Sequence, residues 1–378
     1  MNGDFKVTPW EVTGDIDYDL LVEKFGTKRI DDSLLNRLEG YGDLHFMLRR
    51  GIVYSQRDVE WLLDKYDKGE RFFLYTGRGP SGHTHLGHLM PWIFTKWIQD
   101  TFGVNLYFQL TDDEKFLFNE RLRLEDTYSA AYENALDMIA LGFDPEKTKI
   151  ILDTRSIEEL YPIALKVAKK VTFSTARAVF GFDNSTNIGS IFYTSIQAAP
   201  CFLESVYRGR NVPCLIPCGI DQDPHFRVTR DVATGLGYYK PALLHNKMFP
   251  GLGGGDKMSS SNPDETIYTT DSKKDVKKKI GRAFSGGRVS AEEQRELGGN
   301  PEVCAVYKYN YFLFEGDDQK LDEMATRCRN GDILCGECKK ALTEKINNFL
   351  EKHQARREKA KDIIHTMTLG DYGWNSGR

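Results

Sequence analysis

Two segments of the sequence contain residue types that could bind and stabilise phosphate groups. The first, residues 76–88, is rich in glycine, follows a short apolar run and precedes a helical pattern. Glycines let a backbone approach a ligand closely, and a helix N-terminus offers free N–H groups to an anion. His85 and His88 would lie on one side of the first helical turn and could donate hydrogen bonds to a phosphate chain. A structural turn with two surface histidines, or a zinc site, would use the same residues.

The second segment, residues 257–261, has the sequence KMSSS and follows the glycine-rich residues 251–255. A mobile loop with one lysine and three hydroxyls could close over phosphates, and Lys257 would neutralise charge on a departing pyrophosphate. A flexible surface loop is the alternative. Because each segment follows a strand-like run, a ligand would bind where open α/β sheets bind ligands, at the carboxyl ends of the strands.

Alternating strand-like and helical patterns surround these segments, which is typical of a parallel sheet with helical crossovers. The stretch between residues 110 and 212 is much longer than the dozen or so residues that one crossover needs. It is mostly helical in pattern, so we expect an insertion that divides the sheet into two halves. The expected strands are residues 71–76, 104–110, 148–152, 212–216 and 242–244.

A change of composition near Asp271 marks a further domain. Lysines and arginines concentrate between Lys273 and Arg288, and the patterns after this stretch are helical. We therefore expect an α/β protein with an all-α domain at its C-terminal end. The predicted divisions are an N-terminal extension at 1–70, a sheet domain at 71–270 with its insertion at about 116–205, a helical domain at 271–360 and a tail at 361–378.

The composition excludes several classes of protein. Hydrophobic residues make up 40% and charged residues 28% of the 378 residues, which is too apolar for a disordered chain. The formal net charge of −4 excludes a uniformly basic protein but allows local basic patches that bind nucleic acid. No apolar run approaches the ~18 residues of a membrane span.

The cysteines indicate a reducing compartment. There are 7 of them, an odd and sparse set, so we expect free thiols and a cytoplasmic protein. Cys335 and Cys338 form one Cys-x-x-Cys pair near Cys328, but a zinc site would need a fourth ligand. We therefore predict no metal site.

The two phosphate-binding segments together resemble the class I aminoacyl-tRNA synthetases. Residues 85–88 resemble the HIGH element of that family, and residues 257–261 match its KMSKS-type loop. Further strings resemble the tryptophanyl-tRNA synthetases of the eukaryotic and archaeal type, and the resemblance extends from about residue 10 to about residue 367. Residues 7–12 resemble the N-terminal β-hairpin of that group. The strings are residues 74–80, 109–115, 196–200, 220–224, 283–288, 297–300 and 353–357.

This resemblance implies a Rossmann-like parallel sheet split by a helical connective insertion, followed by an all-α anticodon-binding domain, in a homodimer. It assigns Tyr75 and Gln109 to the indole N–H of L-tryptophan, and Glu114, Gln197 and Gln222 to its α-amino group. It assigns catalysis to Lys257, Ser259, His85 and His88. The implied ATP-binding residues are Thr76, Gly77, Arg78, Gly79, His85, Gly87, His88, Lys257, Met258 and Ser259.

The implied reaction joins L-tryptophan to ATP, with Mg²⁺, to give tryptophanyl-adenylate, and then transfers the tryptophanyl group to tRNA(Trp). The implied tRNA contacts are Arg288, Lys277, Lys278, Arg356 and Arg357. A tyrosyl-tRNA synthetase, another ATP-dependent nucleotidyltransferase and a non-catalytic synthetase paralogue are the alternatives.

Overall fold

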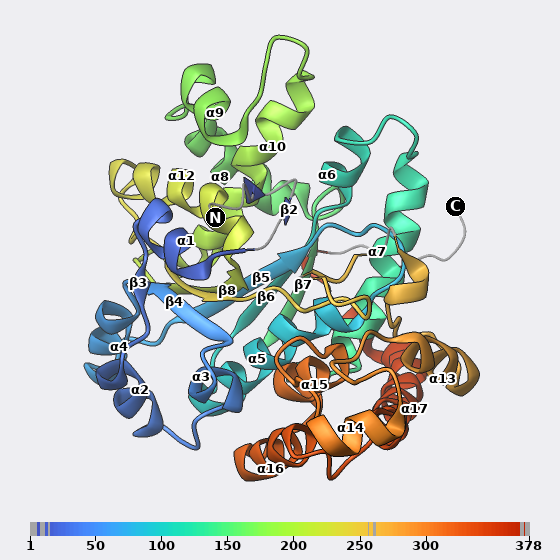
Figure 1. Cartoon of the computed structure of the whole chain (residues 1–378). Coiled ribbons are helices and arrows are strands. Elements are labelled where there is room, and N and C mark those ends of the chain that lie inside the picture. The colour runs from blue at the N-terminus through green and yellow to red at the C-terminus, as the bar shows by residue number, and fades with distance from the viewer. Residues whose placement is uncertain are drawn as a thin grey trace.

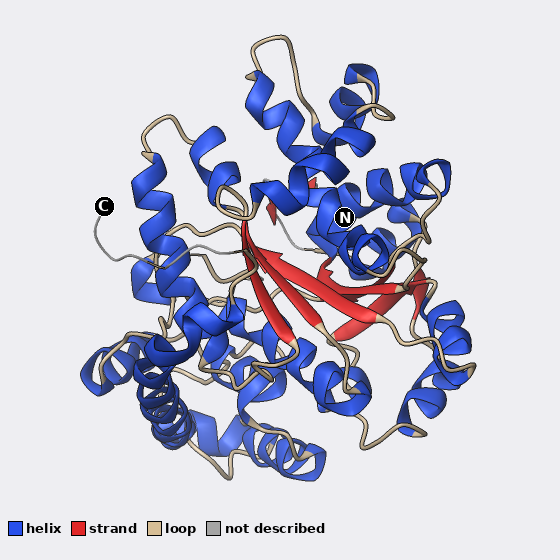
Figure 2. Cartoon of the chain, turned by 180° about the vertical axis from the view of Figure 1, so that it is seen from behind, coloured by secondary structure: helices blue, strands red, loops and turns tan. Residues whose placement is uncertain are grey.

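The computed structural model describes residues 6–7, 12–13, 16–255, 257–259, 262–370 and 374. A mixed sheet of seven strands forms the centre of this described part, with helices on both faces (Figure 2). The strand order is β3-β4-β9-β8-β5-β6-β7. The five strands from β9 to β7 are parallel to one another, and β4 is antiparallel to both of its neighbours, β3 and β9. The strands are β3 (Lys28–Arg29), β4 (Val53–Arg57), β5 (Phe73–Arg78), β6 (Leu106–Leu110), β7 (Thr148–Leu152), β8 (Cys214–Gly219) and β9 (Ala242–Asn246).

The five parallel strands are those predicted from the sequence, with ends shifted by a few residues, and the α/β prediction is confirmed. Strand β4 was not predicted, because polar residues interrupt its apolar pattern. Ser55 and Gln56 are nonetheless buried, and Ser55 Oγ is hydrogen-bonded to His245 Nδ1 on β9 at 3.0 Å. The antiparallel pairing of β4 with β9 thus extends the sheet into the predicted N-terminal extension.

The first crossover contains helix α5 (Leu86–Phe102), which connects β5 with β6. His85 is its N-cap residue, and Gly103 ends it with a positive φ of 61°, a conformation that favours glycine. Leu86, Leu89 and other apolar residues of α5 are buried in the main core against the sheet. This packing fixes the start of α5 beside the carboxyl end of β5.

The region between β6 and β8 is mainly helical, and part of it rises above one end of the sheet (Figure 1). The predicted insertion at 116–205 also contributes strand β7, which pairs with β6 at the edge of the sheet. These residues therefore do not form a wholly separate body. The helices here are α6 (Asp112–Leu117), α7 (Leu124–Ile139), α8 (Ile157–Ala168), α9 (Phe173–Phe180), α10 (Ile188–Ala198), η1 (Ala199–Phe202) and α11 (Leu203–Tyr207).

The remaining N-terminal and connecting elements border the sheet. Strands β1 (Lys6–Val7) and β2 (Val12–Thr13) pair antiparallel, and residues 8–11 of the predicted hairpin lie outside the described residues. The other elements are α1 (Tyr18–Phe25), α2 (Asp32–Glu39), α3 (Phe46–Arg49), α4 (Val59–Asp67), η2 (Ile220–Gln222), α12 (Asp223–Ala233), η3 (Thr234–Leu236) and η4 (Pro263–Glu265).

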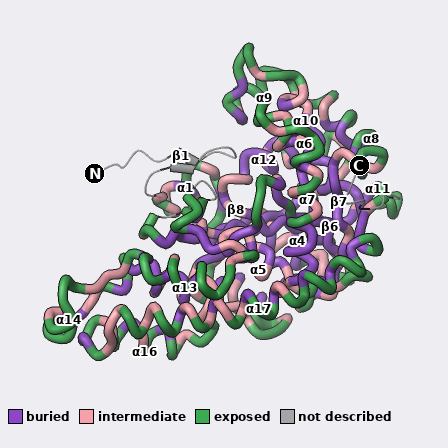
Figure 3. The backbone as a smooth tube through the Cα atoms, turned by 90° about the vertical axis from the view of Figure 1, so that its right-hand side faces the viewer, coloured by how far each residue is buried: buried purple, intermediate pink, exposed green. Residues whose placement is uncertain are grey.

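A helical region follows residue 271, with much of its outer surface exposed (Figure 3). Helix α17 (Cys335–Met367) has 33 residues, continues past the predicted boundary at 360, and buries a stripe from Leu342 to Met367. After α17 the chain returns to the sheet, where Leu369 N donates to Ile150 O at 2.8 Å. None of the described helices is long and apolar enough to cross a membrane. The other helices are α13 (Lys273–Arg282), α14 (Ala291–Leu297), α15 (Ala305–Tyr309), a π-helix (Asn310–Phe314) and α16 (Asp318–Arg329).

Candidate active site

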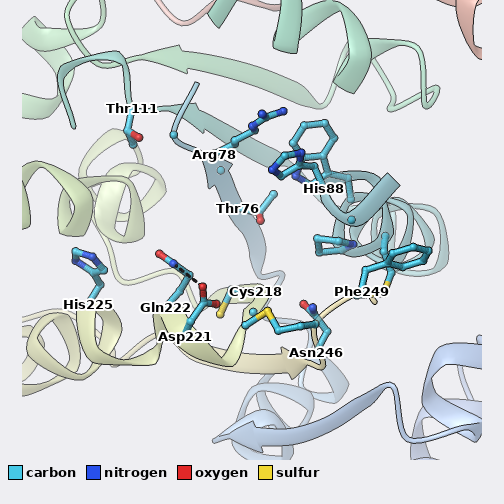
Figure 4. Close-up of a pocket in the computed structure, with 18 of the residues that line it drawn as sticks. Thr76, Arg78, His88, Thr111, Cys218, Asp221, Gln222, His225, Asn246 and Phe249 are labelled. Atoms are coloured by element: carbon cyan, nitrogen blue, oxygen red, sulfur yellow. Dashed lines mark hydrogen bonds between the residues drawn. The ribbon is translucent and has the colours of Figure 1, made fainter. Parts of the chain in front are cut away.

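A cavity of about 510 Å³ lies at the carboxyl ends of β5, β8 and β9 (Figure 4). It extends from the end of β5 to the N-terminus of α5 and the loop after β9. All but one of the residues predicted to bind the amino acid or ATP line it. These residues are Tyr75, Thr76, Gly77, Arg78, Gly79, His85, Gly87, His88, Glu114, Gln197, Gln222, Lys257, Met258 and Ser259.

Gln109 is the exception, because it lies behind Tyr75 and is fully buried. The Tyr75 hydroxyl donates to Gln109 Oε1 and accepts from Gln197 Nε2 at 2.8 Å. Gln109 Nε2 in turn donates to both carboxyl oxygens of Asp153, at 2.8 and 3.0 Å. The hydroxyl of Tyr193 donates to Gln197 Oε1. This end of the cavity is therefore closed by a buried hydrogen-bonded network.

Two of these residues, Asp153 and Tyr193, were not predicted. Asp153 directly follows strand β7, so its position at the carboxyl end of a predicted parallel strand was a signal that could have found it. Tyr193 lies on α10 one helical turn before Gln197, and the i, i+4 spacing brings the two side chains together.

Acidic and amide groups line the wall beside this network. Glu114 accepts hydrogen bonds from Thr111 Oγ1 at 2.6 Å and from Lys115 Nζ at 2.9 Å. Gln222 Nε2 donates to Asp221 Oδ2 at 3.4 Å (Figure 4), and burial raises the pKa of Asp221. A substrate ammonium group placed here would meet the carboxylate and amide oxygens that such a group requires.

The opposite end of the cavity carries Arg78 and the two histidines. Burial lowers the pKa of Arg78 to about 9, so this guanidinium remains charged at neutral pH, and it donates to Thr84 Oγ1 at 2.9 Å. The rings of His85 and His88 are stacked with centroids 3.5 Å apart, and His88 Nδ1 accepts from the backbone N–H of His85 at 3.2 Å. Burial, followed by Arg78 and Lys257, lowers the pKa of His85 to about 3, so its imidazole is neutral at neutral pH.

The two segments that are predicted to bind phosphate lie side by side. A Cβ placed on Gly87 would lie 3.5 Å from Met258 Cβ, so the loop at 257–259 packs against the start of α5. The chain beyond that loop pairs with the first segment, because Leu86 N donates to Ile267 O at 3.1 Å and Thr269 N donates to Thr84 O at 2.9 Å. Lys257 is exposed at the edge of the cavity.

Two glycines at the end of β5 lie very close to neighbouring groups, Gly77 to a backbone oxygen and Gly79 to the ends of flexible side chains. A Cβ on Gly77 would lie 2.5 Å from Gln109 O, and one on Gly79 would lie 2.6 Å from Glu114 Oε2. Both distances are too short for real Cβ contacts. The glycines therefore allow the strand end to pack closely against β6 and α6 while their backbone faces the cavity.

The residues predicted to contact tRNA lie away from the cavity, and they differ in exposure. Lys277, Lys278, Arg288 and Arg356 are exposed. Arg357 is buried and forms ion pairs with Glu133 and, at 3.5 Å, with Asp137. Its charge is already matched inside the protein, so Arg357 is not proposed as an RNA contact.

The cysteines are free thiols in the structure. Cys304, which was not grouped with the others from the sequence, lines a second cavity of about 20 Å³ together with Cys328, Cys335 and Cys338. Within the described ranges, no three His, Cys, Asp or Glu side chains form a group that could hold a metal ion.

The sequence and the structure both match known proteins. The family model "tRNA synthetases class I (W and Y)" matches residues 67–351. The tryptophan--tRNA ligase of Pyrobaculum calidifontis is 52% identical over 370 residues, which cover 98% of this chain and 99% of the relative. The structure of the tryptophanyl-tRNA synthetase of Aeropyrum pernix has a TM-score of 0.85 at 35% identity, covering 94% of this chain and 97% of that one. A tryptophan-bound synthetase from Encephalitozoon cuniculi has a TM-score of 0.86 at 36% identity, with 94% and 98% covered.

The fold, the cavity and these matches place the chain in one class of enzyme: it belongs to the class I tRNA synthetases of the tryptophanyl and tyrosyl family. Within that family, its full-length relatives at about half identity are tryptophan--tRNA ligases. The prediction of a tryptophan--tRNA ligase, made above over a tyrosyl enzyme and a non-catalytic paralogue, is confirmed by these relatives.

Proposed function

We propose that the cavity activates L-tryptophan with ATP, and that the tryptophanyl group is then transferred to tRNA(Trp). One observation carries the proposal: a single cavity joins a buried tyrosine–glutamine network to two phosphate-binding segments. The first part suits a large amino acid with one N–H donor, and the second suits a triphosphate.

At the amino-acid end, Tyr75 supplies the acceptor for the indole N–H, with Gln109 behind it. A buried indole nitrogen is a donor only, so it requires an oxygen acceptor. Glu114, Gln197 and Gln222 surround the α-amino group. A pocket that must pair a buried N–H rejects phenylalanine, because its own polar groups would then stay unpaired.

At the phosphate end, the tryptophan carboxylate attacks the α-phosphate of ATP. A bond forms between the carboxylate oxygen and phosphorus, and the bond between the α- and β-phosphates breaks, which releases pyrophosphate. Arg78 and Lys257 offset the negative charge, while the imidazoles of His85 and His88 and the hydroxyl of Ser259 donate hydrogen bonds to phosphate oxygens. Gly87 leaves space for the adenosine beside Met258.

Mg²⁺ enters this proposal as the ion carried by the phosphates of ATP, as part of the substrate. The described residues hold no three-ligand group for a resident metal ion, and Mg²⁺ is commonly bound through substrate phosphates. Neither chemical step needs a protein nucleophile, so positioning and charge stabilisation do the catalytic work.

The exposed basic residues of the helical region are the proposed contacts for tRNA. Lys277, Lys278, Arg288 and Arg356 offer charge to the phosphate backbone. Arg288 is held in place because its N–H donates to Gln294 Oε1 at 2.9 Å and its Nε donates to Gly298 O at 2.8 Å. We also propose a homodimer in the cytoplasm.

The test is amino-acid-dependent exchange of pyrophosphate into ATP, measured with tryptophan, tyrosine and phenylalanine in parallel. The proposal predicts exchange with tryptophan alone, followed by charging of tRNA(Trp). Exchange with tyrosine alone would keep the mechanism and overturn the assignment of the amino-acid end. Exchange with none of the three would overturn the proposed activity.

A further inference from the structure

Four buried side chains, one on helix α10, two on the strands β5 and β6 and one directly after β7, form a hydrogen-bonded chain. Gln197 Nε2 donates to Tyr75 Oη, Tyr75 Oη donates to Gln109 Oε1, and Gln109 Nε2 donates to Asp153. The chain ends at Asp153, where both carboxyl oxygens lie within 3.0 Å of the Gln109 nitrogen. The Tyr75 hydroxyl also lies 3.0 Å from the backbone oxygen of Gln197, which is a second acceptor for its hydrogen.

The sheet itself produces this arrangement. Tyr75 lies on β5, Gln109 lies on β6 opposite Gly77, and Asp153 lies one residue beyond the end of β7, where Ile151 is paired with Gln109. Each step moves to the next strand and two residues further along it. Because side chains alternate between faces with a period of two, all three point to the same face.

A carboxyl group at position 153 carries a free-energy cost. It is fully buried, and a buried carboxyl group destabilises the fold unless it is hydrogen-bonded. Burial, with Asp113 and Asp112 nearby, raises the pKa of Asp153 well above its ordinary value, and Asp153 is hydrogen-bonded to the carboxyl group of Asp113. Gln109 Nε2 donates to both carboxyl oxygens of Asp153, so Asp153 is the acceptor on the side that faces Gln109.

We propose that Asp153 is a positioning residue for amino-acid specificity, which orients the Gln109 amide with its oxygen toward Tyr75, so that Gln109 accepts from the Tyr75 hydroxyl instead of donating to it. Tyr75 then offers its remaining lone pair to the pocket as an acceptor. This inference rests on the proposed function, in which Tyr75 meets the indole N–H. It goes beyond that function by naming the group that sets the direction of the network.

Without Asp153, either orientation of the Gln109 amide becomes possible. If its NH₂ group turned toward Tyr75, it would donate to Oη, which already accepts from Gln197 Nε2 at 2.8 Å. The Tyr75 hydrogen would then turn to the backbone oxygen of Gln197, 3.0 Å away, and both lone pairs of Oη would be occupied, so none would remain for the indole N–H. The pocket would lose its preference for a donor, although its shape would be unchanged.

The test compares L-tryptophan with β-(3-benzothienyl)alanine, in which sulfur replaces the indole N–H at nearly the same size. The measured quantity is the ratio of kcat/KM for the two amino acids in pyrophosphate exchange. Asp153→Leu keeps the volume of the side chain and removes the acceptor, so this ratio is expected to fall about tenfold, the effect of one lost buried hydrogen bond. Asp153→Asn keeps an acceptor oxygen for Gln109 and an N–H for Asp113, so the ratio is expected to stay near that of the unmodified protein.

Two further variants make the test specific. Gln109→Ala should lower the ratio as much as Asp153→Leu does, and the double variant should lower it no further, because both remove the same interaction. Asp112→Leu is the matched control: Asp112 is also buried in this acidic group but accepts from Thr154 N, at 3.1 Å, rather than from Gln109. It should leave the ratio unchanged. If either leucine variant fails to fold, the corresponding alanine variant replaces it.

Equal losses of activity with both amino acids in Asp153→Leu would overturn the inference, because a purely structural role predicts that result. An unchanged ratio in Gln109→Ala would also overturn the inference. The proposed function would still stand in that case, as long as the protein catalysed exchange with tryptophan. If the unmodified protein showed no exchange with tryptophan, the proposed function would fail and this inference with it.

Discussion

The amino-acid end of the cavity is built on the strands β5, β6 and β7, whereas its phosphate end is built from a helix N-terminus and a loop. At the first end, Tyr75 and Gln109 are fully buried and are held by hydrogen bonds to other residues of the protein. At the second end, Lys257 is exposed and the imidazoles are held neutral by burial. The difference follows from the chemistry: an indole ring does not change during the reaction, so its site can be rigid. The phosphate chain gains and redistributes charge, so it needs groups that can follow it.

The largest effect is expected at the phosphate end. Lys257→Ala should slow adenylate formation on the order of a hundredfold or more, because it removes a charge that acts when pyrophosphate departs. Tryptophan binding should change little. Single-turnover adenylate formation and equilibrium binding of tryptophan measure the two effects, and the exposed Lys240 outside the cavity provides the control variant Lys240→Ala. Unchanged single-turnover kinetics would refute the role of Lys257.

A smaller effect is expected at the amino-acid end, where the use of tryptophan rather than of ATP should be impaired. Tyr75→Phe removes the acceptor and leaves buried groups of Gln109 and Gln197 unpaired, so kcat/KM for tryptophan should fall by about ten- to a hundredfold. The KM for ATP should stay within about twofold. The control is Tyr161→Phe, at a tyrosine that is exposed on α8. Equal losses for tryptophan and ATP would remove the distinction between the two ends.

The pH dependence of stability tests whether the phosphate end keeps its imidazoles neutral. The pKa of His85 is about 3 when folded, below the ordinary value of about 6.5 that applies when unfolded. Between these values the unfolded protein binds a proton that the folded protein does not, so stability falls as pH falls from about 6.5. His85→Gln removes this contribution, and the difference in free energy of unfolding between the two proteins should change by about 1.4 kcal/mol per pH unit in that range. Denaturant unfolding at pH 6.5 and 5 measures it, and a constant difference would mean that His85 titrates normally.

The smallest effect is expected outside the cavity. Replacing Lys277 and Lys278 together by alanine should lower kcat/KM for tRNA several-fold and reduce its salt dependence by about one charge per lysine. Pyrophosphate exchange should be unaffected. Lys169 and Lys170, which are neighbours in the sequence and are also exposed, provide the matched control when both are replaced by alanine. If both pairs lowered tRNA charging equally, the basic stretch after residue 271 would have no special role.

Most residues predicted from the sequence to bind the amino acid or ATP do line the cavity, because they fall in short motifs at strand ends and at a helix start. How deeply each side chain is buried could not be predicted from the sequence. Gln109 was predicted to meet the substrate, and its side chain is fully buried behind Tyr75 on the neighbouring strand, to which it is hydrogen-bonded. This contact depends on pairing between strands that are distant in the sequence, and a linear pattern does not reveal it.

The basic residues and the edge of the sheet show the same limit. Arg356 and Arg357 look alike in the sequence, but one position along α17 separates an exposed guanidinium from one buried against Glu133 and Asp137 on α7. Strand β4 was missed because Ser55 and Gln56 look like surface residues, and their burial depends on partners such as His245. In each case the decisive neighbour comes from a remote part of the chain.

We propose that one end of the cavity binds the indole ring and that the other end binds the phosphates. The most direct measurement is a crystal structure with a non-hydrolysable tryptophanyl-adenylate analogue. We expect the indole nitrogen about 3 Å from Tyr75 Oη, which is a hydrogen-bond distance. We also expect the group replacing the α-phosphate beside His88, and the adenosine over Gly87. An indole ring placed elsewhere, with its nitrogen paired to another residue or to none, would contradict this assignment of the two ends of the cavity.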